Sequence, residues 1–143
     1  MIVMPVRQIM TRRVVTVRPE TTLAEARRLL DEHRIRHLPV LLDGRLAGIV
    51  SDRDLRSAAG ANRRQTAVDE IMTPTPFIVG PDTRVEEAAR LMLDRRIGGL
   101  PVVEASELIG IVTSDDLLRA LLVVVEAATL EGISVELTGP RDA

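Results

Sequence analysis

Two short stretches decide the fold: Gly-Ile-Val-Ser-Asp-Arg-Asp-Leu at Gly48–Leu55 and Gly-Ile-Val-Thr-Ser-Asp-Asp-Leu at Gly110–Leu117. Each begins with a glycine and two β-branched residues, which favour a strand, and continues with a hydroxyl residue that is followed three positions later by aspartate. That spacing is typical of a helix start, because both side chains can bind backbone N–H groups that have no partner within the helix. Each stretch therefore predicts a strand that runs directly into a helix.

The two stretches belong to an internal repeat. Residues 6–58 align with residues 68–120 at a constant offset of 62 without a gap, and 23 of the 53 aligned pairs are identical. Identity at this level indicates duplication of one unit, and two copies predict an intramolecular pair rather than a solenoid. The repeat divides the chain into four segments: a first repeat at 6–60, a linker at 61–67, a second repeat at 68–131 with an extended C-terminal helix, and a tail at 132–143.

Within each repeat we expect the order β-α-β-β-α, which is an α/β (α+β) fold. The first strand is expected at Val14–Val17 and at Phe77–Val79, where residues that favour strands precede a proline. The first helix is expected to start at Thr22–Glu25 and at Thr83–Glu86, since Thr-x-x-Glu has the spacing of a capping box. Apolar residues then recur at helical spacing in both copies.

A hairpin is expected next, at Leu38–Val50 around the turn Asp43-Gly44, because Asp-Gly favours a two-residue turn between strands. In the second repeat the same positions hold Ala105-Ser106, so we expect a turn of a different type there. The second helix of each repeat is expected to begin near Asp52 and near Ser114.

The two repeats differ after this helix. In the first repeat the second helix should break at Gly60. In the second repeat it continues through the apolar run Leu121–Val125 to about Leu130. A helix that is apolar nearly all round needs burial, so we expect it to pack against another subunit. Beyond it, the alternation within Ile133–Leu137 is typical of a short strand.

Size and composition argue against independent folding of one repeat, against disulfides and several kinds of metal site, and against a membrane span. A repeat of 53 aligned residues would be marginal alone, so we expect the two sheets to pack face to face with pseudo-twofold symmetry. The chain has no cysteine and two histidines, which argues against disulfides and against thiolate or histidine-rich metal sites. No apolar stretch reaches the roughly 18 residues of a membrane span, so we expect a soluble, cytoplasmic protein.

Charge is unevenly distributed along the chain. Residues 1–64 hold 13 arginines against 7 acidic residues, whereas residues 65–143 hold 6 arginines against 14. This polarity favours a head-to-tail homodimer in which the basic half of one copy faces the acidic half of the other. All 19 basic residues are arginine, which suits phosphate binding but is explained more simply by codon usage. Arginine pairs without neighbouring aromatic residues, in a chain of acidic net charge, argue against nucleic-acid binding.

Four motifs of the second repeat resemble a known family. They are Ile-Met-Thr-x-x-x-x-x-Val at Ile71–Val79, Glu-Ala-x-x-Leu-Met at Glu87–Met92, Leu-Pro-Val-Val at Leu100–Val103, and Gly-Ile-Val-Thr-x-x-Asp-Leu at Gly110–Leu117. Together they resemble the cystathionine-β-synthase (CBS) domain, and two in tandem resemble a Bateman module. The resemblance covers residues 6–120, and the short flanking segments make the chain similar to stand-alone CBS-pair proteins.

The resemblance implies two clefts between the paired sheets that bind adenosine-containing ligands: AMP, ADP or ATP, or S-adenosylmethionine. The ribose would be held by an aspartate with a hydroxyl residue beside it, at Asp54 with Ser51 and at Asp116 with Thr113. The adenine would rest against the first strand, around Thr11 and Val15 in one copy and around Thr73 and Phe77 in the other.

The phosphate would meet basic residues just before Leu-Pro-Val, which the resemblance places at Arg36 and His37. The second repeat has Gly98 and Gly99 at these positions, which puts a second phosphate-binding cleft in doubt. The residues themselves add a reason why the ribose and the phosphate should bind at different places. A carboxylate that binds the ribose repels phosphate, which must therefore point toward fixed positive charge, and Arg53 could also supply it.

The residues leave alternatives open. Ser51-x-x-Asp54 and Thr113-x-x-Asp116 equally fit helix capping with no ligand at all. His37 invites a catalytic role, but no serine or second histidine completes a triad pattern. We therefore expect a non-enzymatic regulatory module with no required cofactor and no metal, which senses an adenine nucleotide, forms a homodimer and acts on an effector protein. The alternative is a scaffold of the same fold with empty clefts, whose function is dimerisation.

Overall fold

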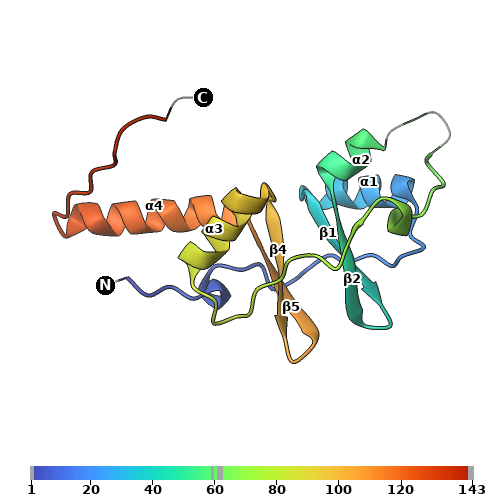
Figure 1. Ribbon diagram of the computed structural model, residues 1–143, viewed down its shortest axis with the longest axis horizontal. Helices are drawn as coiled ribbons and strands as arrows, with labels where there is room; N and C mark the ends of the chain where they lie inside the picture. The colour runs from blue at the N-terminus through green and yellow to red at the C-terminus, as the bar shows by residue number, and fades with distance from the viewer. Residues whose placement is uncertain (1, 59, 61–62, 142–143) are drawn as a thin grey trace.

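The computed structural model describes residues 2–58, 60 and 63–141, so residues 61–62 of the expected linker and 142–143 of the tail lie outside it. Figure 1 shows two similar units side by side, each built from a β-hairpin and two helices, with both ends of the chain on the side of the second unit. The predicted mixed α/β class with two repeats is confirmed.

The two units contain equivalent elements in the same order. The first unit consists of α1 (Leu23–His33), β1 (His37–Leu42), β2 (Arg45–Ser51) and α2 (Asp52–Ser57). The second consists of α3 (Val85–Arg95), β4 (Gly99–Glu104), β5 (Glu107–Thr113) and α4 (Ser114–Leu130). Short 3-10 turns precede them, η1 (Val6–Gln8) and η2 (Val68–Glu70). Both hairpins are antiparallel and carry an irregularity of register at the equivalent place, after Val40 and after Val102.

Each hydrophobic core takes a residue from the other repeat. Val6, from the start of the first repeat, is buried in the core of the second unit, and Val68 is buried in the core of the first. The Val6 N–H donates to the Thr83 carbonyl at 2.7 Å, and the Val68 N–H donates to the Thr21 carbonyl at 2.8 Å. The repeats that are visible in the sequence are therefore not independent folding units.

A few residues farther along each repeat, the two repeats also pair through short backbone hydrogen bonds. Thr11 and Ile111 of β5 exchange two backbone hydrogen bonds of 2.8 and 3.0 Å. In the equivalent place β3 (Thr73–Pro74) pairs with β2, so that Thr73 lies opposite Ile49. The beginning of each repeat therefore lies beside the strand-to-helix junction of the other repeat.

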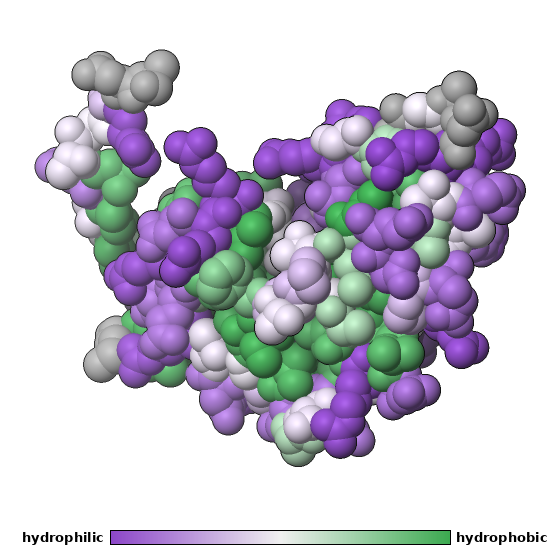
Figure 2. All heavy atoms as spheres, turned by 45° about the vertical axis from the view of Figure 1, so that its right-hand side comes forward, coloured by the Kyte–Doolittle hydropathy of each residue, from purple (hydrophilic) through white to green (hydrophobic). Residues whose placement is uncertain are grey.

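The two hairpins meet along β2 and β5. Gly48 of β2 lies against Met72, and Gly110 of β5 lies against Met10. A Cβ atom at either glycine would stand 2.5 or 2.7 Å from the methionine sulfur and close to a backbone carbonyl, so a larger residue would not fit without movement. The expected packing of sheet against sheet with pseudo-twofold symmetry is confirmed, and Figure 2 shows the surface hollowed between two lobes with hydrophilic rims.

Hydroxyl residues cap three of the four helices as the sequence predicts. The Thr22 hydroxyl accepts a hydrogen bond from the Glu25 N–H at 3.1 Å at the start of α1. Ser51 and Thr113 form complete capping boxes with the aspartates three residues later, at the starts of α2 and α4. The capping interpretation of these two motifs is therefore confirmed, and it is compatible with ligand binding by the same aspartates.

The capping box predicted at Thr83–Glu86 is wrong. Helix α3 has Arg84 as its N-cap, and this residue makes no side-chain capping bond. Thr83 instead stabilises the preceding turn, where its hydroxyl accepts from the Gly80 N–H at 3.0 Å. The offset of 62 already equates Arg84 with Thr22, so the Thr-x-x-Glu spacing in the second repeat was displaced by one residue.

The strands predicted at Val14–Val17 and Phe77–Val79 do not form. Val17 makes one parallel bridge to β1, where its N–H donates to the Pro39 carbonyl at 3.0 Å and its carbonyl accepts from the Leu41 N–H at 2.9 Å. Val79 is held on β4 in the same way. Because the proline of each Leu-Pro-Val motif has no N–H, the ladder cannot continue past it.

The two hairpin turns have equivalent backbones, so the different turn type expected for the second repeat is wrong. Asp43 and Gly44 have φ angles of 51° and 78°, and Ala105 and Ser106 have φ angles of 50° and 67°. Two left-handed residues in a two-residue loop are typical of the type I′ turn, whose twist matches that of the strands. The hairpin therefore imposes this turn even where the sequence lacks glycine.

Helix α4 reaches Leu130 as predicted, but its apolar residues are not buried within the chain. Six of them are between 51% and 89% exposed: Leu118, Leu121, Leu122, Val123, Val125 and Leu130. Their burial against another subunit stays a prediction. The short strand predicted within Ile133–Leu137 is wrong, because this segment is irregular and exposed. Among the residues that the structure describes, none of the helices combines the length and the apolar character that crossing a membrane requires.

Candidate ligand-binding clefts

Two clefts open at the seam between the units, one beside each strand-to-helix junction. Their cavity volumes are about 380 Å³ for the first cleft and about 140 Å³ for the second. All the residues predicted to bind ligand line one or both of them. The first is lined by Arg36, His37, Ser51, Arg53, Asp54, Thr73, Phe77, Gly99 and Thr113, and the second by Thr11, Val15, Arg36, His37, Thr113 and Asp116.

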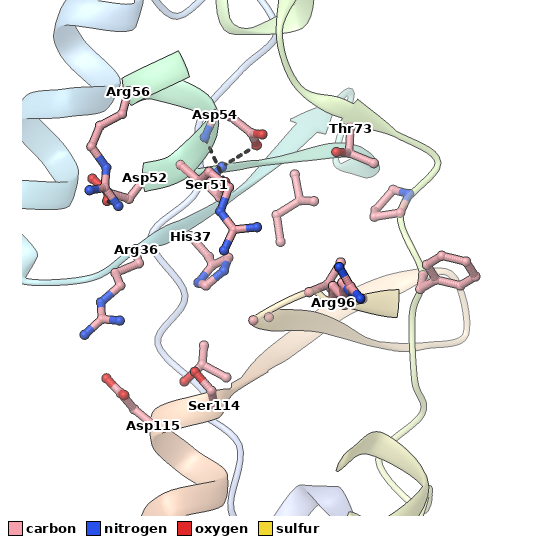
Figure 3. A pocket seen from close by; sticks show the side chains of 18 residues that line it. Arg36, His37, Ser51, Asp52, Asp54, Arg56, Thr73, Arg96, Ser114 and Asp115 are labelled. Atoms are coloured by element: carbon pink, nitrogen blue, oxygen red, sulfur yellow. Dashed lines mark hydrogen bonds and ion pairs between the residues drawn. The ribbon is translucent and has the colours of Figure 1, made fainter. Parts of the chain in front are cut away.

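Ser51 and Asp54 form an acidic wall of the first cleft, at the junction of β2 and α2 (Figure 3). The Asp54 carboxylate accepts a hydrogen bond from the Ser51 N–H at 2.8 Å, and the Ser51 hydroxyl accepts from the Asp54 N–H at 3.1 Å. In the described part of the chain the Ser51 N–H is the only donor to this carboxylate, so most of its lone pairs are free. Those oxygens can accept hydrogen bonds from both hydroxyls of a ribose.

Positive charge surrounds the same opening. Arg36, Arg53 and Arg96 line the first cleft with exposed side chains, and no ion pair engages them among the described residues. Figure 3 shows Asp54 beside Ser51 on one wall of the first cleft, and Arg36 and Arg96 on two other sides of it. Asp115 is a further acidic residue on the wall. Within the described residues, three guanidinium groups and two carboxylates of this cleft form no ion pair, which favours a ligand that carries negative charge at one end and hydroxyl groups at the other.

The remaining acidic residue of the first cleft is already neutralised. Asp52 lies between Arg27 and Arg56, each at 2.7 Å. The hydrogen bond from Arg27 lowers the pKa of the Asp52 carboxyl. Within the described residues no group of three His, Asp or Glu side chains is placed to hold a metal ion. Asp54 is therefore the carboxylate of this junction that remains open to a ligand.

Phe77 is the one phenylalanine of the chain, which has no tryptophan or tyrosine. It lies in the segment after β3, is 47% exposed and lines the first cleft. The Arg95 guanidinium carbon lies 4.8 Å from the ring centroid, a cation–π contact that holds the ring from one side. The exposed part of the ring gives a flat base a surface on which to stack.

His37 lies between the two clefts and lines both. Its imidazole rests on Gly98 and Gly99: a Cβ at Gly99 would stand 2.9 Å from the His37 Cγ, and a Cβ at Gly98 would stand 3.3 Å from its Cε1. Because Gly99 is the offset equivalent of His37, this contact lies at the pseudo-twofold axis, where one partner must be small if the other is large. Burial lowers the pKa of His37, so the imidazole is neutral at neutral pH.

Asp116 occupies the position in the second cleft that Asp54 has in the first, but it is 5% exposed and fully bonded. One carboxylate oxygen accepts from the Thr113 N–H at 2.8 Å and from the Thr113 hydroxyl at 3.1 Å. The other accepts from the Thr11 hydroxyl at 3.4 Å and from the Arg119 guanidinium at 3.1 Å. The two clefts therefore share a motif without sharing its chemistry.

The sequence interpretation missed five arginines that line the clefts, Arg56 and Arg96 in the first and Arg13, Arg34 and Arg119 in the second. Arg34 and Arg96 are an identical pair at the offset of 62, and both end a helix at a left-handed φ of 54°. That identity was a usable signal. Arg119 gave none, because the equivalent position holds Ser57 and because its role depends on a contact one helical turn away.

A family model matches the chain twice, once in each repeat. The model of the CBS domain matches residues 6–61 and again residues 68–123. Among curated proteins, the chain is 38% identical to the CBS domain-containing protein YhcV of Bacillus subtilis over 114 residues, which cover 78% of this chain and 81% of YhcV. It is 45% identical over 106 residues to inosine-5'-monophosphate dehydrogenase of Korarchaeum cryptofilum, but there the match covers 73% of this chain and only 22% of the enzyme.

Solved structures agree with this assignment. AcuB of Vibrio cholerae has a TM-score of 0.80 at 32% identity, with 94% of this chain and 100% of that chain covered. CBSX2 of Arabidopsis thaliana, solved in complex with AMP, has a TM-score of 0.76 at 37% identity, with 84% and 97% covered. The CBS domain pair of MJ0100, solved with 5-methylthioadenosine and S-adenosyl-L-methionine, has a TM-score of 0.80 at 30% identity, with 86% and 99% covered. The chain therefore belongs to the CBS domain family, as a tandem pair of CBS domains.

Proposed function

We propose that this chain is a non-enzymatic regulatory module that binds an adenine nucleotide of the AMP, ADP or ATP class in the first cleft. The observation that carries the proposal is the open carboxylate of Asp54, which lines a cavity of about 380 Å³ together with three arginines that form no ion pair within the described part of the chain. That volume lies within the roughly 300–1,000 Å³ of small-molecule sites. Relatives of the same fold were solved with AMP and with S-adenosyl-L-methionine, which supports an adenosine-containing ligand in general.

The charge of the first cleft favours a phosphorylated ligand over S-adenosylmethionine. In the proposed pose the ribose hydroxyls donate to Asp54, and the adenine lies beside Thr73 and Phe77. The phosphate then points toward Arg36 and Arg53, because the carboxylate repels it. A sulfonium ligand would bring its positive charge among these guanidinium groups, where repulsion opposes binding.

The proposed output is a shift of population between two packings of the repeats. A ligand in the first cleft touches both units at once, so it stabilises the arrangement that it bridges. We propose that the module forms a head-to-tail homodimer, in which the exposed apolar face of α4 is covered, and that an effector protein reads the change. The same fold with an empty cleft, acting as a dimerisation scaffold, is the second candidate, and the exposed face of α4 is the observation that favours it.

Binding separates the two candidates. Isothermal titration with AMP, ADP, ATP and S-adenosylmethionine should show saturable binding of the nucleotides and weaker binding of S-adenosylmethionine. Adenosine, which lacks the phosphate, should also bind more weakly. Since the chain has no tryptophan or tyrosine, any nucleotide that co-purifies with it would dominate its ultraviolet spectrum. Absence of binding to all of these compounds at millimolar concentration would leave the scaffold as the function.

The substitution Asp54→Asn tests the site itself. Asparagine keeps the shape, and its side-chain oxygen can still accept the hydrogen bond from the Ser51 N–H, so the free energy of unfolding should fall by no more than about 1 kcal/mol, the contribution of a charge in the first turn of a helix. The loss of a charged acceptor, typically about 1.5–3 kcal/mol, should weaken AMP binding roughly 10- to 100-fold. Asp94→Asn, at an exposed position of α3, is the matched control and should bind AMP as the unmodified chain does. Equal affinity of both variants would place the ligand elsewhere.

A further inference from the structure

The two clefts differ in the hydrogen-bond donors to their aspartate, Asp116 in the second cleft and Asp54 in the first. Asp116 in the second cleft accepts four hydrogen bonds, which fill the acceptor positions of a carboxylate. Two of them come from side chains that face the cleft, the Thr11 hydroxyl and the Arg119 guanidinium. In the first cleft, within the described residues, Asp54 has one donor, the Ser51 N–H.

The difference arises from one position of the repeat. Arg119 stands one helical turn after Asp116 on α4, and its guanidinium reaches back to the carboxylate at 3.1 Å. The equivalent residue on α2 is Ser57, whose short side chain cannot reach Asp54. The nearby Arg56 does not replace it, because its guanidinium pairs with Asp52.

The size of the second cleft agrees with an occupied state. With Arg119 and Thr11 bonded to Asp116, its cavity volume is about 140 Å³, well below that of the first cleft and below the roughly 300 Å³ at which small-molecule sites begin. Its wall still carries Arg13, Arg34 and Arg36, so the positive charge that a phosphate needs is present. The second cleft therefore has residues that could bind a phosphate, but it lacks space for a nucleotide and a free carboxylate.

We propose that Arg119 is a built-in occupant of the second cleft, whose guanidinium takes the place of ligand hydroxyl groups on Asp116, so that each chain binds one nucleotide. This inference rests on the proposed function of the first cleft. It predicts that removing the guanidinium frees the Asp116 carboxylate, enlarges the cavity and creates a second nucleotide site with the acid and the arginines already in place.

The test is the stoichiometry of AMP binding by isothermal titration at saturating concentration. The unmodified chain should bind one AMP per chain, and Arg119→Ser, which installs the residue of the first repeat, should bind two. Arg90→Ser, which removes an exposed arginine of α3 and changes the net charge equally, should keep one site. Adding Asp116→Asn to Arg119→Ser should remove the second site only, whereas adding Asp54→Asn should remove the first only. If Arg119→Ser does not fold, Arg119→Ala, with its higher helix propensity, makes the same measurement.

The outcomes separate this inference from the proposed function. Two sites in the unmodified chain, or one site in the folded Arg119 variants, would overturn the role of Arg119 and leave the first cleft intact as the nucleotide site. A loss of all binding in the Arg119 variants would also overturn it, because Arg119 would then be a ligand contact. No binding in the unmodified chain would remove the proposed function and this inference together.

Discussion

His37 and Gly99 form a contact between one residue and its own repeat equivalent. Because a Cβ at Gly99 would stand 2.9 Å from the His37 Cγ, Gly99→Ala should overpack this point. Overpacking of this kind costs about 1–3 kcal/mol. Urea unfolding of Gly99→Ala, of His37→Ala and of the double variant measures the coupling. We expect His37→Ala to restore most of the stability that Gly99→Ala loses, and additive losses would show that the two side chains do not meet.

The same histidine should make stability depend on pH. Burial lowers the pKa of His37. The positive charge of Arg36 lowers it further, whereas the negative charges of Asp54, Asp115 and Asp52 raise it. The unfolded chain, whose histidine titrates near ~6.5, therefore binds a proton that the folded chain does not. The resulting stability is fully present above this pH and is lost as the pH falls through it toward the lower folded pKa. His37→Gln should flatten the free energy of unfolding between about pH 7 and 5.

The control is a substitution away from this contact. Arg90 is exposed on α3, and Arg90→Ser should leave the slope of stability against pH as it is in the unmodified chain. If both variants keep the slope, carboxylates rather than His37 cause it.

Among single residues, the sequence located side chains that line the two clefts, whereas ligand binding by them stays a prediction and the hydrogen bonds of Asp116 were missed. The aspartates and hydroxyl residues could be found because capping and ligand binding demand the same spacing at a strand-to-helix junction. The hydrogen bonds of Asp116 to Thr11 and Arg119 could not be found, because Thr11 is 105 positions away and because the residue equivalent to Arg119 in the first repeat is Ser57.

Among the elements, the β4–β5 hairpin carries an avoidable strain. Ser106 holds a φ of 67° without being glycine, whereas Gly44 stands at the equivalent position of the first hairpin. A left-handed conformation costs an ordinary residue roughly 1–2 kcal/mol, and the greater freedom of unfolded glycine returns about 0.5–1 kcal/mol of that. Ser106→Gly should therefore raise the free energy of unfolding by about 0.5–1 kcal/mol in urea titrations.

The reciprocal change tests the same explanation. No atom would lie within 4 Å of a Cβ at Gly44, so Gly44→Ser should destabilise through its backbone alone and by a similar amount. A Ser106→Gly variant of unchanged or lower stability would mean that the turn relaxes to another type when glycine is absent.

The elements that sequence reasoning predicted correctly are those whose signals are local. The four helices and two hairpins follow from spacing and from turn residues over about ten positions. The first strand of each repeat failed because its pairing depends on a proline in another strand, Pro39 or Pro101, which cannot donate to it. The turn in the second hairpin failed because the strand twist, not the residues Ala105-Ser106, selects it.

In the whole molecule the two repeats are interlocked. Val6 completes the core of the second unit and Val68 completes that of the first, so neither repeat contains all of its own core. This arrangement also places the start of one repeat against the strand-to-helix junction of the other. A ligand bound in the first cleft, as proposed above, would therefore contact both repeats, which is the structural requirement for signalling by their relative packing.

The surface that remains unexplained within one chain is the exposed apolar face of α4, and it leads to a prediction about assembly. Analytical ultracentrifugation should show a dimer, and Leu122→Glu should convert it to a monomer, because a charge would be buried without a partner. Leu42→Glu, at a similarly exposed leucine beside the β1–β2 turn, should remain a dimer.

If the basic half of one copy faces the acidic half of the other, the dimer should also weaken as sodium chloride rises from about 0.05 to 0.5 M, since salt screens exposed charges. A dimer that loses its stability with Leu122→Glu but ignores salt would instead have α4 against α4 and would refute the head-to-tail arrangement, whereas a monomer under all conditions would refute the dimer itself.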